Sequence, residues 1–292
     1  YGALSGNPLD ALQTGAGGRV SEGNQQEKRP PADFLLWKED ASHIMKWPSP
    51  GWGGGMEAAG YPGWHIECTV MSARRLLGDA AFAELLAHPG PDPAIIDLHS
   101  GGEDNIFPHH ECEIAQSAAA FCSHARSGQG TFSRMWFHPR FLMVEGEKMS
   151  KSKGNFFTAR DLLAMGYEPA AIRLELIKTH YRSNANFTEQ GLKDSTRMVE
   201  RWRRFAESAG GGGGGAGGGT GSSPASAPAG AQSPSSRLPV EQAFAEAMND
   251  DLNIAGALGE LNKWLGETPK PTAADLAALK RLDAVLGILE RE

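Results

Sequence analysis

The sequence predicts an α/β fold in which a parallel sheet covered by helices is followed by a small helical bundle. Before residue 209, short apolar runs alternate with amphipathic stretches, which is typical of strands alternating with helices. Residues 209–236 are rich in Gly, Ala, Ser and Pro and carry no charge, so they predict a flexible tether without a fold. After the tether, apolar residues recur at spacings of three and four, which predicts helices.

The predicted elements can be followed in chain order. Before the tether they are a strand at 64–71, a helix at 72–86, a strand at 95–99, a helix at 109–121, a strand at 140–144 and a helix at 159–165. After the tether they are helices at 240–248, 254–265 and 273–289. Pro108 suits the start of its helix, because its ring fixes a helical φ where the missing N–H is not needed. Two Gly- and Pro-rich stretches, 51–63 and 88–93, are predicted to be inserted loops.

Composition and charge exclude several classes of protein. The 292 residues contain no apolar run of the roughly 18 to 20 residues that a membrane span needs, and the first ten residues lack the pattern of a targeting peptide. The formal net charge of −7 argues against capture of nucleic acid by the whole surface but leaves room for a local basic patch. Three cysteines are too few for a disulfide framework, which favours a reducing compartment.

His109 and Glu113 are four residues apart at the start of a predicted helix, so their side chains lie on one face. Two ligands of one metal need this spacing, and Cys68, the last residue of the segment WHIEC in the first predicted strand, adds a thiolate. Cysteine, histidine and carboxylate together suit zinc better than calcium or magnesium, and three protein ligands leave one position open. Spacing alone leaves His110 and Glu111 as rival ligands, and it is also compatible with residues that only build the start of the helix.

A short loop after the predicted strand 140–144 carries three lysines, Lys148, Lys151 and Lys153, separated by small residues and a methionine. Such a loop can close over a polyphosphate. Lysine there neutralises the negative charge that builds up as the bond to the α-phosphorus is exchanged. The alternative is a solvated basic loop without a ligand.

Two further groups of residues are candidates for binding. Gly101 and Gly102 follow the predicted strand 95–99, where glycine lets the backbone approach a ligand, and Asp104 could accept hydrogen bonds from a ribose or an amine. A plain turn is the alternative there. Three arginines at helical spacing could contact an RNA backbone, although a solvated helix face is the commoner role of such a row. They are Arg197, Arg201 and Arg204.

Five segments, taken in order, carry a likeness to a known family. They are PGWHIEC at 62–68, DLHSGGEDNIFPHHECEIAQS at 97–117, KMSKSKGNF at 148–156, HYRSNANFT at 180–188 and AMNDDLN at 247–253. Together they resemble the cysteinyl-tRNA synthetases, which are class I aminoacyl-tRNA synthetases. KMSKS alone is typical of class I synthetases in general, whereas WHIEC with FPHHECE is specific to the cysteine enzymes and to one close relative, the mycothiol cysteine ligases. The likeness covers nearly the whole chain outside the tether and the two predicted inserted loops.

The resemblance implies a domain organisation and a set of site residues. It implies a Rossmann-like catalytic domain at 1–158, a helical connection at 159–208, the flexible insertion at 209–236 and a truncated tRNA-binding bundle at 237–292. Cys68, His109 and Glu113 are the implied zinc ligands. The other implied roles are catalysis for Lys148 and Lys151, binding of ATP or the adenylate for Ser150, Lys151, Gly101, Gly102 and Asp104, and a pocket for substrate cysteine for Trp64 and His99.

The implied activity is ATP-dependent activation of L-cysteine and transfer to tRNA-Cys, with Mg²⁺ accompanying ATP. The alternatives are a mycothiol-type ligase with a sugar amine as acceptor, and a non-catalytic derivative that binds zinc or RNA. We expect a monomer in the cytosol, with an organelle left open. The family's fourth zinc ligand, a cysteine, and its His-Ile-Gly-His motif lie upstream of the residue that matches Tyr1. We therefore expect this chain by itself to bind zinc weakly and to be inactive.

Overall fold

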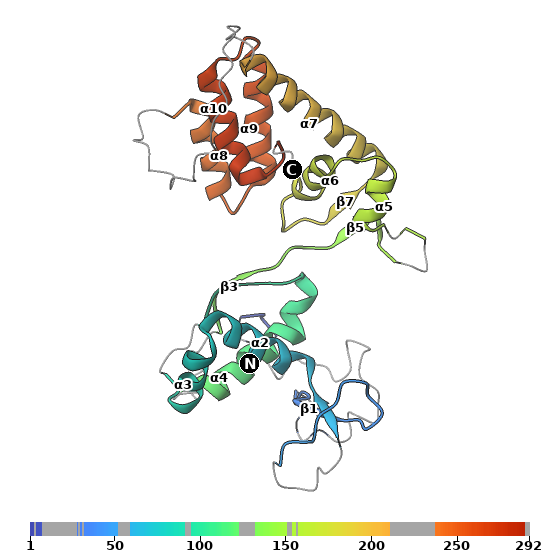
Figure 1. Cartoon of the computed structure of the whole chain (residues 1–292), viewed down its shortest axis with the longest axis vertical. Helices are drawn as coiled ribbons and strands as arrows, with labels where there is room; N and C mark the ends of the chain where they lie inside the picture. The colour runs from blue at the N-terminus through green and yellow to red at the C-terminus, as the bar shows by residue number, and fades with distance from the viewer. Residues whose placement is uncertain are drawn as a thin grey trace, which may run out of the picture. The chain divides into compact units, whose positions relative to one another are not determined.

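The computed structural model describes most of the chain in two compact units, 1–139 and 140–292, each of which is described by itself (Figure 1). The described residues are 1–2, 4–7, 28, 30, 32–51, 59–90, 95–122, 132–150, 154–155, 157–210 and 237–289. None of the helices in these ranges is both long enough and apolar enough to cross a membrane.

The first unit contains two small sheets and a group of helices (Figure 1). Its strands are β1 (Trp37–Glu39), β2 (Gly60–Pro62), β3 (Ile96–Ser100) and β4 (Ser133–Phe137); β1 pairs with β2 antiparallel and β3 with β4 parallel. Its helices are α2 (Trp64–Leu77), α3 (Asp79–Ala87), the 3-10 turn η2 (Glu103–Asn105), the π turn η3 (Ile106–His110) and α4 (Glu111–Phe121). A core of Ala73, Ile96, Phe121 and Phe132 joins α2, α4 and the β3–β4 pair.

The predicted strand at 64–71 is wrong, because these residues form the first two turns of α2. The aromatic and β-branched residues of this run favour a strand by propensity, and tertiary packing overrides that preference. Thr69 and Ala73, four residues apart, are buried, whereas Val70 and Met71 are exposed, which is the one-sided burial of a helix rather than strand alternation. Helix α2 ends at Leu77 and is followed by Gly78, whose positive φ of 81° suits glycine, so the predicted helix 72–86 is divided between α2 and α3.

The other predicted elements of the first unit are present. β3 matches the predicted strand 95–99, and η3 with α4 matches the predicted helix 109–121. The parallel register places His99 opposite Trp136, so the end of β3 lies beside the end of β4. Part of the predicted loop 51–63 is instead strand β2, while residues 52–58 and 91–93 of the two predicted loops lie outside the described residues.

The second unit begins with a three-stranded sheet. Its order is β6 (Glu147–Lys148), β5 (Leu142–Val144), β7 (Ala185–Phe187), with β5 parallel to β7 and antiparallel to β6. Helices α5 (Ala159–Ala164) and α6 (Pro169–Ile177) pack on it through Val144, Leu162, Ile172 and Phe187. Thr158 begins α5 with a capping box, so the predicted helix 159–165 is confirmed.

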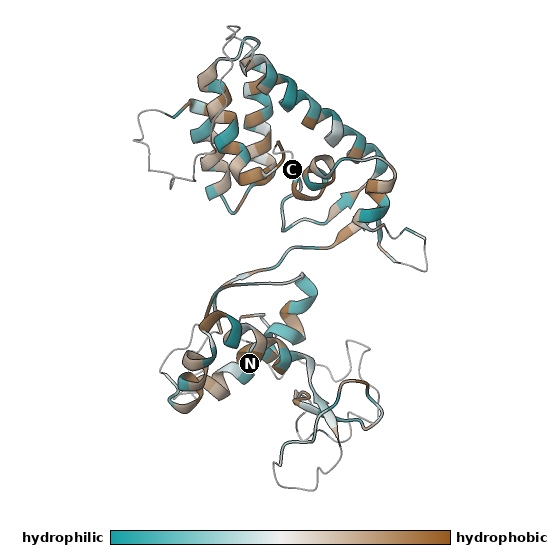
Figure 2. Ribbon diagram, viewed as in Figure 1, coloured by the Kyte–Doolittle hydropathy of each residue, from teal (hydrophilic) through white to brown (hydrophobic). Residues whose placement is uncertain are grey.

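Long helices complete the second unit. They are α7 (Glu189–Gly210), α8 (Pro239–Asn249), α9 (Ile254–Glu267) and α10 (Ala273–Leu286), and all three helices predicted after the tether are confirmed to within a few residues. Each carries both apolar and polar residues (Figure 2), and their apolar residues share one core that includes Trp202. The Trp202 indole is fully buried and donates to Asn262 Oδ1 at 2.9 Å. Ala209 and Gly210 of the predicted tether belong to α7, and 211–236 lie outside the described residues.

The predicted fold class is confirmed by the parallel β3–β4 and β5–β7 pairs and their covering helices. The division between the two compact units falls after Pro139, so the strands that lead to Lys148 belong to the second unit. The predicted domain boundaries, which follow functional parts rather than compactness, stay a prediction.

Candidate active site

Three side chains from three elements meet at a position where a metal ion could bind. Cys68 comes from α2, His109 from the end of η3 and Glu113 from the first turn of α4. Their ligand atoms all lie within 4.8 Å of one another. Gln116 of α4 fixes the two helices at this point, because its amide donates to the carbonyl of His65 at 2.6 Å and to Thr69 Oγ1. Because α2 and α4 are joined at this point, the face shared by His109 and Glu113 lies beside Cys68 of α2.

The carboxylate of Glu113 is fully buried, and only one of its two oxygens has a hydrogen-bond partner among the described residues. Its side chain is 0% exposed, and Oε2 lies 2.9 Å from His99 Nε2 and 3.8 Å from His109 Nε2. Oε1 has no hydrogen-bond partner among the described residues. A buried charged oxygen without a partner is costly, and a cation beside it offsets that cost. A thiol, an imidazole and this carboxylate together fit zinc.

His65, which the sequence did not single out, orients the ring of His109. The two Nδ1 atoms are 2.7 Å apart, so one nitrogen donates to the other, and Trp64 stacks on His109 at 4.3 Å between ring centroids. Burial, followed by the neighbouring His109, lowers the pKa of His65 to about 4, so His65 is neutral at pH 7 and can accept. When His109 Nδ1 donates, its Nε2 lone pair remains free for a metal.

Burial and the nearby carboxylates of Glu113 and Glu67 raise the pKa of the Cys68 thiol. Without a cation, Cys68 therefore remains a neutral thiol at pH 7. A bound cation favours the thiolate, so binding of a metal at this position would release a proton.

The rival ligands have other partners. Glu111 accepts hydrogen bonds from the backbone N–H groups of Gly2 at 2.7 Å and Ser5 at 2.9 Å, so both of its oxygens hold the first residues of the chain. His110 Nδ1 lies 2.8 Å from His138 Nε2, and burial lowers its pKa to about 3. His110 also forms a second possible metal cluster with His99 and Glu113. Both clusters use Glu113, whereas Glu111 belongs to neither.

The segment after β3 holds three of the predicted adenylate residues, Gly101, Gly102 and Asp104. Gly101 cannot carry a side chain without a shift, because a Cβ there would lie 2.8 Å from His110 Cε1. His99 leads into this turn and holds Glu113, while Asp104 in η2 is exposed. Trp64 is 54% exposed beside His109. The structure thus brings Trp64 beside His109 and His99 beside Glu113. The predicted binding roles of these two residues, of the glycines and of Asp104 stay predictions.

The basic loop is described in part. Lys148 ends β6 with its ammonium group 5.0 Å from the centre of the Phe141 ring. Asn155 closes the base of the loop, because its side chain accepts from the Ser150 N–H at 2.8 Å and donates to the Lys148 carbonyl at 3.3 Å. Lys151 lies outside the described residues, so its predicted role stays a prediction.

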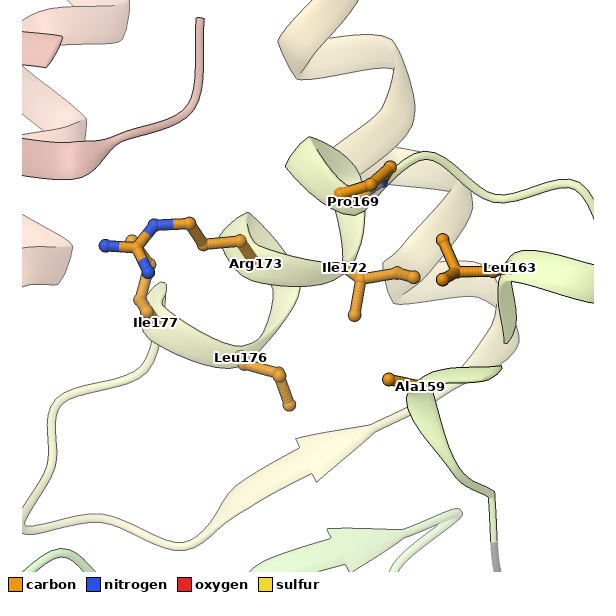
Figure 3. Close-up of a pocket in the computed structure, with 7 residues that line it drawn as sticks. All are labelled: Ala159, Leu163, Pro169, Ile172, Arg173, Leu176 and Ile177. Carbon is orange, nitrogen blue, oxygen red and sulfur yellow. The ribbon is translucent and has the colours of Figure 1, made fainter. Parts of the chain in front are cut away.

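The second unit also contains an apolar hollow of about 290 Å³ between α5 and α6 (Figure 3). It is lined by Ala159, Leu163, Pro169, Ile172, Arg173, Leu176 and Ile177. These side chains offer no nucleophile, carboxylate or metal ligand, and Arg173 Nε donates to the Leu286 carbonyl at 2.6 Å. The hollow is therefore not a candidate catalytic site.

The predicted arginine row on α7 is partly engaged in local contacts. Arg197 pairs with Asp194 one turn earlier, and Arg201 donates to the Asn262 carbonyl at 2.5 Å. All three arginines are exposed, which favours a solvated helix face, and contact with RNA stays a prediction.

Comparison with known proteins identifies the family. The model for the catalytic domain of class I (C) tRNA synthetases matches residues 1–197. This chain belongs to that family. Proteins named cysteine–tRNA ligase from Escherichia coli (strain SMS-3-5 / SECEC) and Shigella boydii serotype 4 (strain Sb227) are both 38% identical to the whole chain. The chain covers 53% and 56% of these two relatives, so it spans about half of their length.

A solved structure supports the fold. The crystal structure of the ternary complex of Agrobacterium radiobacter K84 agnB2 LeuRS, tRNA and LeuAMS matches 83% of this chain and 32% of its own chain. The TM-score is 0.50 and the sequence identity 18%, so the likeness concerns the fold alone. This chain and the matched part of that structure thus share a fold.

Proposed function

We propose that this chain is the catalytic part of a cysteine–tRNA ligase, which activates L-cysteine with ATP and transfers the cysteinyl group to tRNA-Cys. The observation that carries the proposal is the buried carboxylate of Glu113, one oxygen of which lacks a partner among the described residues, beside Cys68 and His109. This cluster suits a zinc ion, and the names of the relatives supply the reaction that such an ion serves.

Cys68, His109 and Glu113 would hold a zinc ion. Such an ion would bind the substrate sulfur as a thiolate, which the hydroxyl of serine cannot replace. His65 keeps the ring of His109 in place, and His99 does the same for the carboxylate of Glu113. Because this recognition rests on the sulfur itself, the reaction needs no editing step against serine.

The nucleotide half of the reaction uses the predicted ATP residues. The carboxylate of cysteine attacks the α-phosphorus of ATP and pyrophosphate leaves, with Mg²⁺ accompanying ATP. Lys148 and Lys151 neutralise charge on the phosphates, and Ser150 binds in the same loop. Gly101 and Gly102 allow close approach of the backbone to the adenylate, and Asp104 accepts hydrogen bonds from a ribose or an amine. In the second step the terminal adenosine of tRNA takes the cysteinyl group through a hydroxyl oxygen, and AMP leaves.

The partners in this proposal are tRNA-Cys, L-cysteine and ATP. We further propose a monomer in the cytosol.

The test is transfer of labelled cysteine to tRNA by the full-length gene product, with the amine precursor of mycothiol offered as a competing acceptor. We expect tRNA to be charged by the parent and by Cys122→Ala, and charging to be lost in Cys68→Ala. Cys122 is the matched control, because it is also a cysteine of the first unit and belongs to neither of the two metal clusters found among the described residues. Transfer to the amine alone, or equal activity of the two cysteine variants, would overturn the proposal.

A further inference from the structure

The turn between α8 and α9 has an unusual backbone. Asp251 and Leu252 are consecutive non-glycine residues with φ of 52° and 57°, in the left-handed region that most L-residues avoid. Backbone hydrogen bonds fix the turn, from Leu252 N–H to the Met248 carbonyl at 3.1 Å and from Asn253 N–H to the Ala247 carbonyl at 3.2 Å. Strained backbone of this kind persists where the surrounding structure requires it.

The strained turn presents Asp251 to the segment 180–182. Tyr181 Oη donates to Oδ1 at 2.6 Å, and Arg182 Nε donates to Oδ2 at 2.5 Å. The ring of His180 lies with Nε2 2.8 Å from the Asp251 carbonyl oxygen. One residue of the α8–α9 turn thus contacts three consecutive residues that lie between α6 and β7. These contacts join two of the segments that carried the family likeness, HYRSNANFT and AMNDDLN.

This network is a poor source of stability. The side chains of Arg182 and Asp251 are 65% and 47% exposed, and ion pairs with such exposure contribute little to folding. The strained backbone at Asp251 therefore serves to hold the segment 180–182 in place rather than to stabilise the folded protein.

The segment 180–182 leads directly to the strands that carry Lys148. The Tyr181 carbonyl accepts from the Arg140 N–H at 2.8 Å, just before β5. β7 then pairs in parallel with β5, and the Phe187 carbonyl accepts from the Glu145 N–H at 3.1 Å. β5 pairs with β6, which ends at Lys148. A continuous set of hydrogen bonds therefore runs from the α8–α9 turn to the base of the lysine loop.

We propose that Asp251 is a positioning residue that fixes the strands carrying Lys148 against the turn between α8 and α9. Its catalytic consequence rests on the proposed function: the rate of cysteine activation depends on a carboxylate in the helical part of the chain. Asp251 acts through Tyr181 and Arg182, which hold β7 and the entry to β5. Binding of cysteine at the metal cluster does not depend on Asp251.

The first experiment compares two glycine substitutions at neighbouring left-handed positions. Asp251→Gly removes the carboxylate and Leu252→Gly removes an exposed leucine side chain, and glycine suits both backbones. Hydrogen exchange of the 292-residue chain then reports the amides of Arg140 and Glu145. We expect about tenfold faster exchange in Asp251→Gly and less than about twofold change in Leu252→Gly. Equal exchange in the two variants would overturn the proposal.

The second experiment measures cysteine-dependent exchange of pyrophosphate into ATP by the full-length gene product. We expect kcat to fall about tenfold in Asp251→Gly, with KM for cysteine unchanged, because misplacement of a catalytic group affects the chemical step. Asp251→Asn keeps an acceptor for Tyr181 and should recover part of this loss, and Leu252→Gly should match the parent.

The outcomes separate the two proposals. Faster amide exchange in Asp251→Gly with an unchanged kcat would overturn the positioning role in catalysis. A parent without pyrophosphate exchange would overturn the proposed function, and the hydrogen-exchange comparison would still decide whether Asp251 holds the strands.

Discussion

Replacing Glu113 by glutamine separates the burial cost of this carboxylate from its use as a metal ligand. The substitution keeps the shape of the side chain and removes its charge. In the metal-free protein a buried oxygen without a partner costs about 1–3 kcal/mol. Part of this cost remains in Glu113→Gln, because one polar atom of the glutamine amide is buried without a partner at the same position. We therefore expect metal-free Glu113→Gln to be more stable than the parent by about 1 kcal/mol, or about 2–4 °C in Tm.

Zinc should reverse this order. At free zinc about 100-fold above Kd, binding adds about 2.7 kcal/mol to the stability of the parent, or about 5–10 °C in Tm. Glu113→Gln has a neutral amide in place of a ligand, so its Tm should rise by less than about 2 °C. The assay is thermal unfolding followed by circular dichroism, with chelator-treated protein measured before and after addition of zinc.

Glu175 provides the matched control, because it is a buried carboxylate with partners. Its side chain lies against Ser195 Oγ and Lys178 Nζ, each 2.6 Å from Oε2. Glu175→Gln should therefore lose about 1–3 kcal/mol with and without zinc, and its zinc-induced shift should equal that of the parent. A zinc-induced shift of the same size in Glu113→Gln and the parent would refute the assignment of Glu113 as a ligand.

Two further substitutions test the packing of each unit. Glu241 accepts two hydrogen bonds from Arg281, at 2.6 and 2.9 Å, and these contacts lower its pKa below the ordinary 4.5. The stability that this carboxylate contributes is therefore present above about pH 4.5 and is lost as the pH falls through its lowered pKa. Glu241→Gln should cost about 1–2 kcal/mol in urea unfolding at pH 7, and a cost that is as large at pH 3 as at pH 7 would contradict this. Gly101→Ala should lower the free energy of unfolding by about 1–3 kcal/mol, because its methyl group would meet the imidazole of His110. Gly90→Ala is the control, because a Cβ there meets no atom within 4 Å, and its Tm should stay near that of the parent. Equal changes in Tm for the two variants would show that the turn after β3 is not tightly packed.

The part of the site that could be predicted from the sequence depends on local geometry. His109 and Glu113 are four residues apart on a helix, and helical periodicity alone places both on one face. The sequence could not exclude Glu111 as a ligand, because its partners Gly2 and Ser5 lie more than 100 residues away. For the same reason the contact between Asp251 and Arg182 could not be predicted, although both belong to segments that were singled out. Pairings between distant segments depend on tertiary structure, which periodicity does not contain.

The wrong prediction of a strand at residues 64–71 also hid a residue of the candidate site. In a strand, residues three apart point to opposite faces, so His65 and Cys68 would be separated. In a helix, residues three apart share a face. Helix α2 therefore presents the thiol of Cys68 and the ring that orients His109 to the same side, toward α4. His65 was missed for this reason: its role exists only when the segment WHIEC is helical, and the aromatic and β-branched residues of that segment favoured a strand. The helical assignment thus adds a support for the proposed metal ligand His109 and corrects the element predicted at residues 64–71.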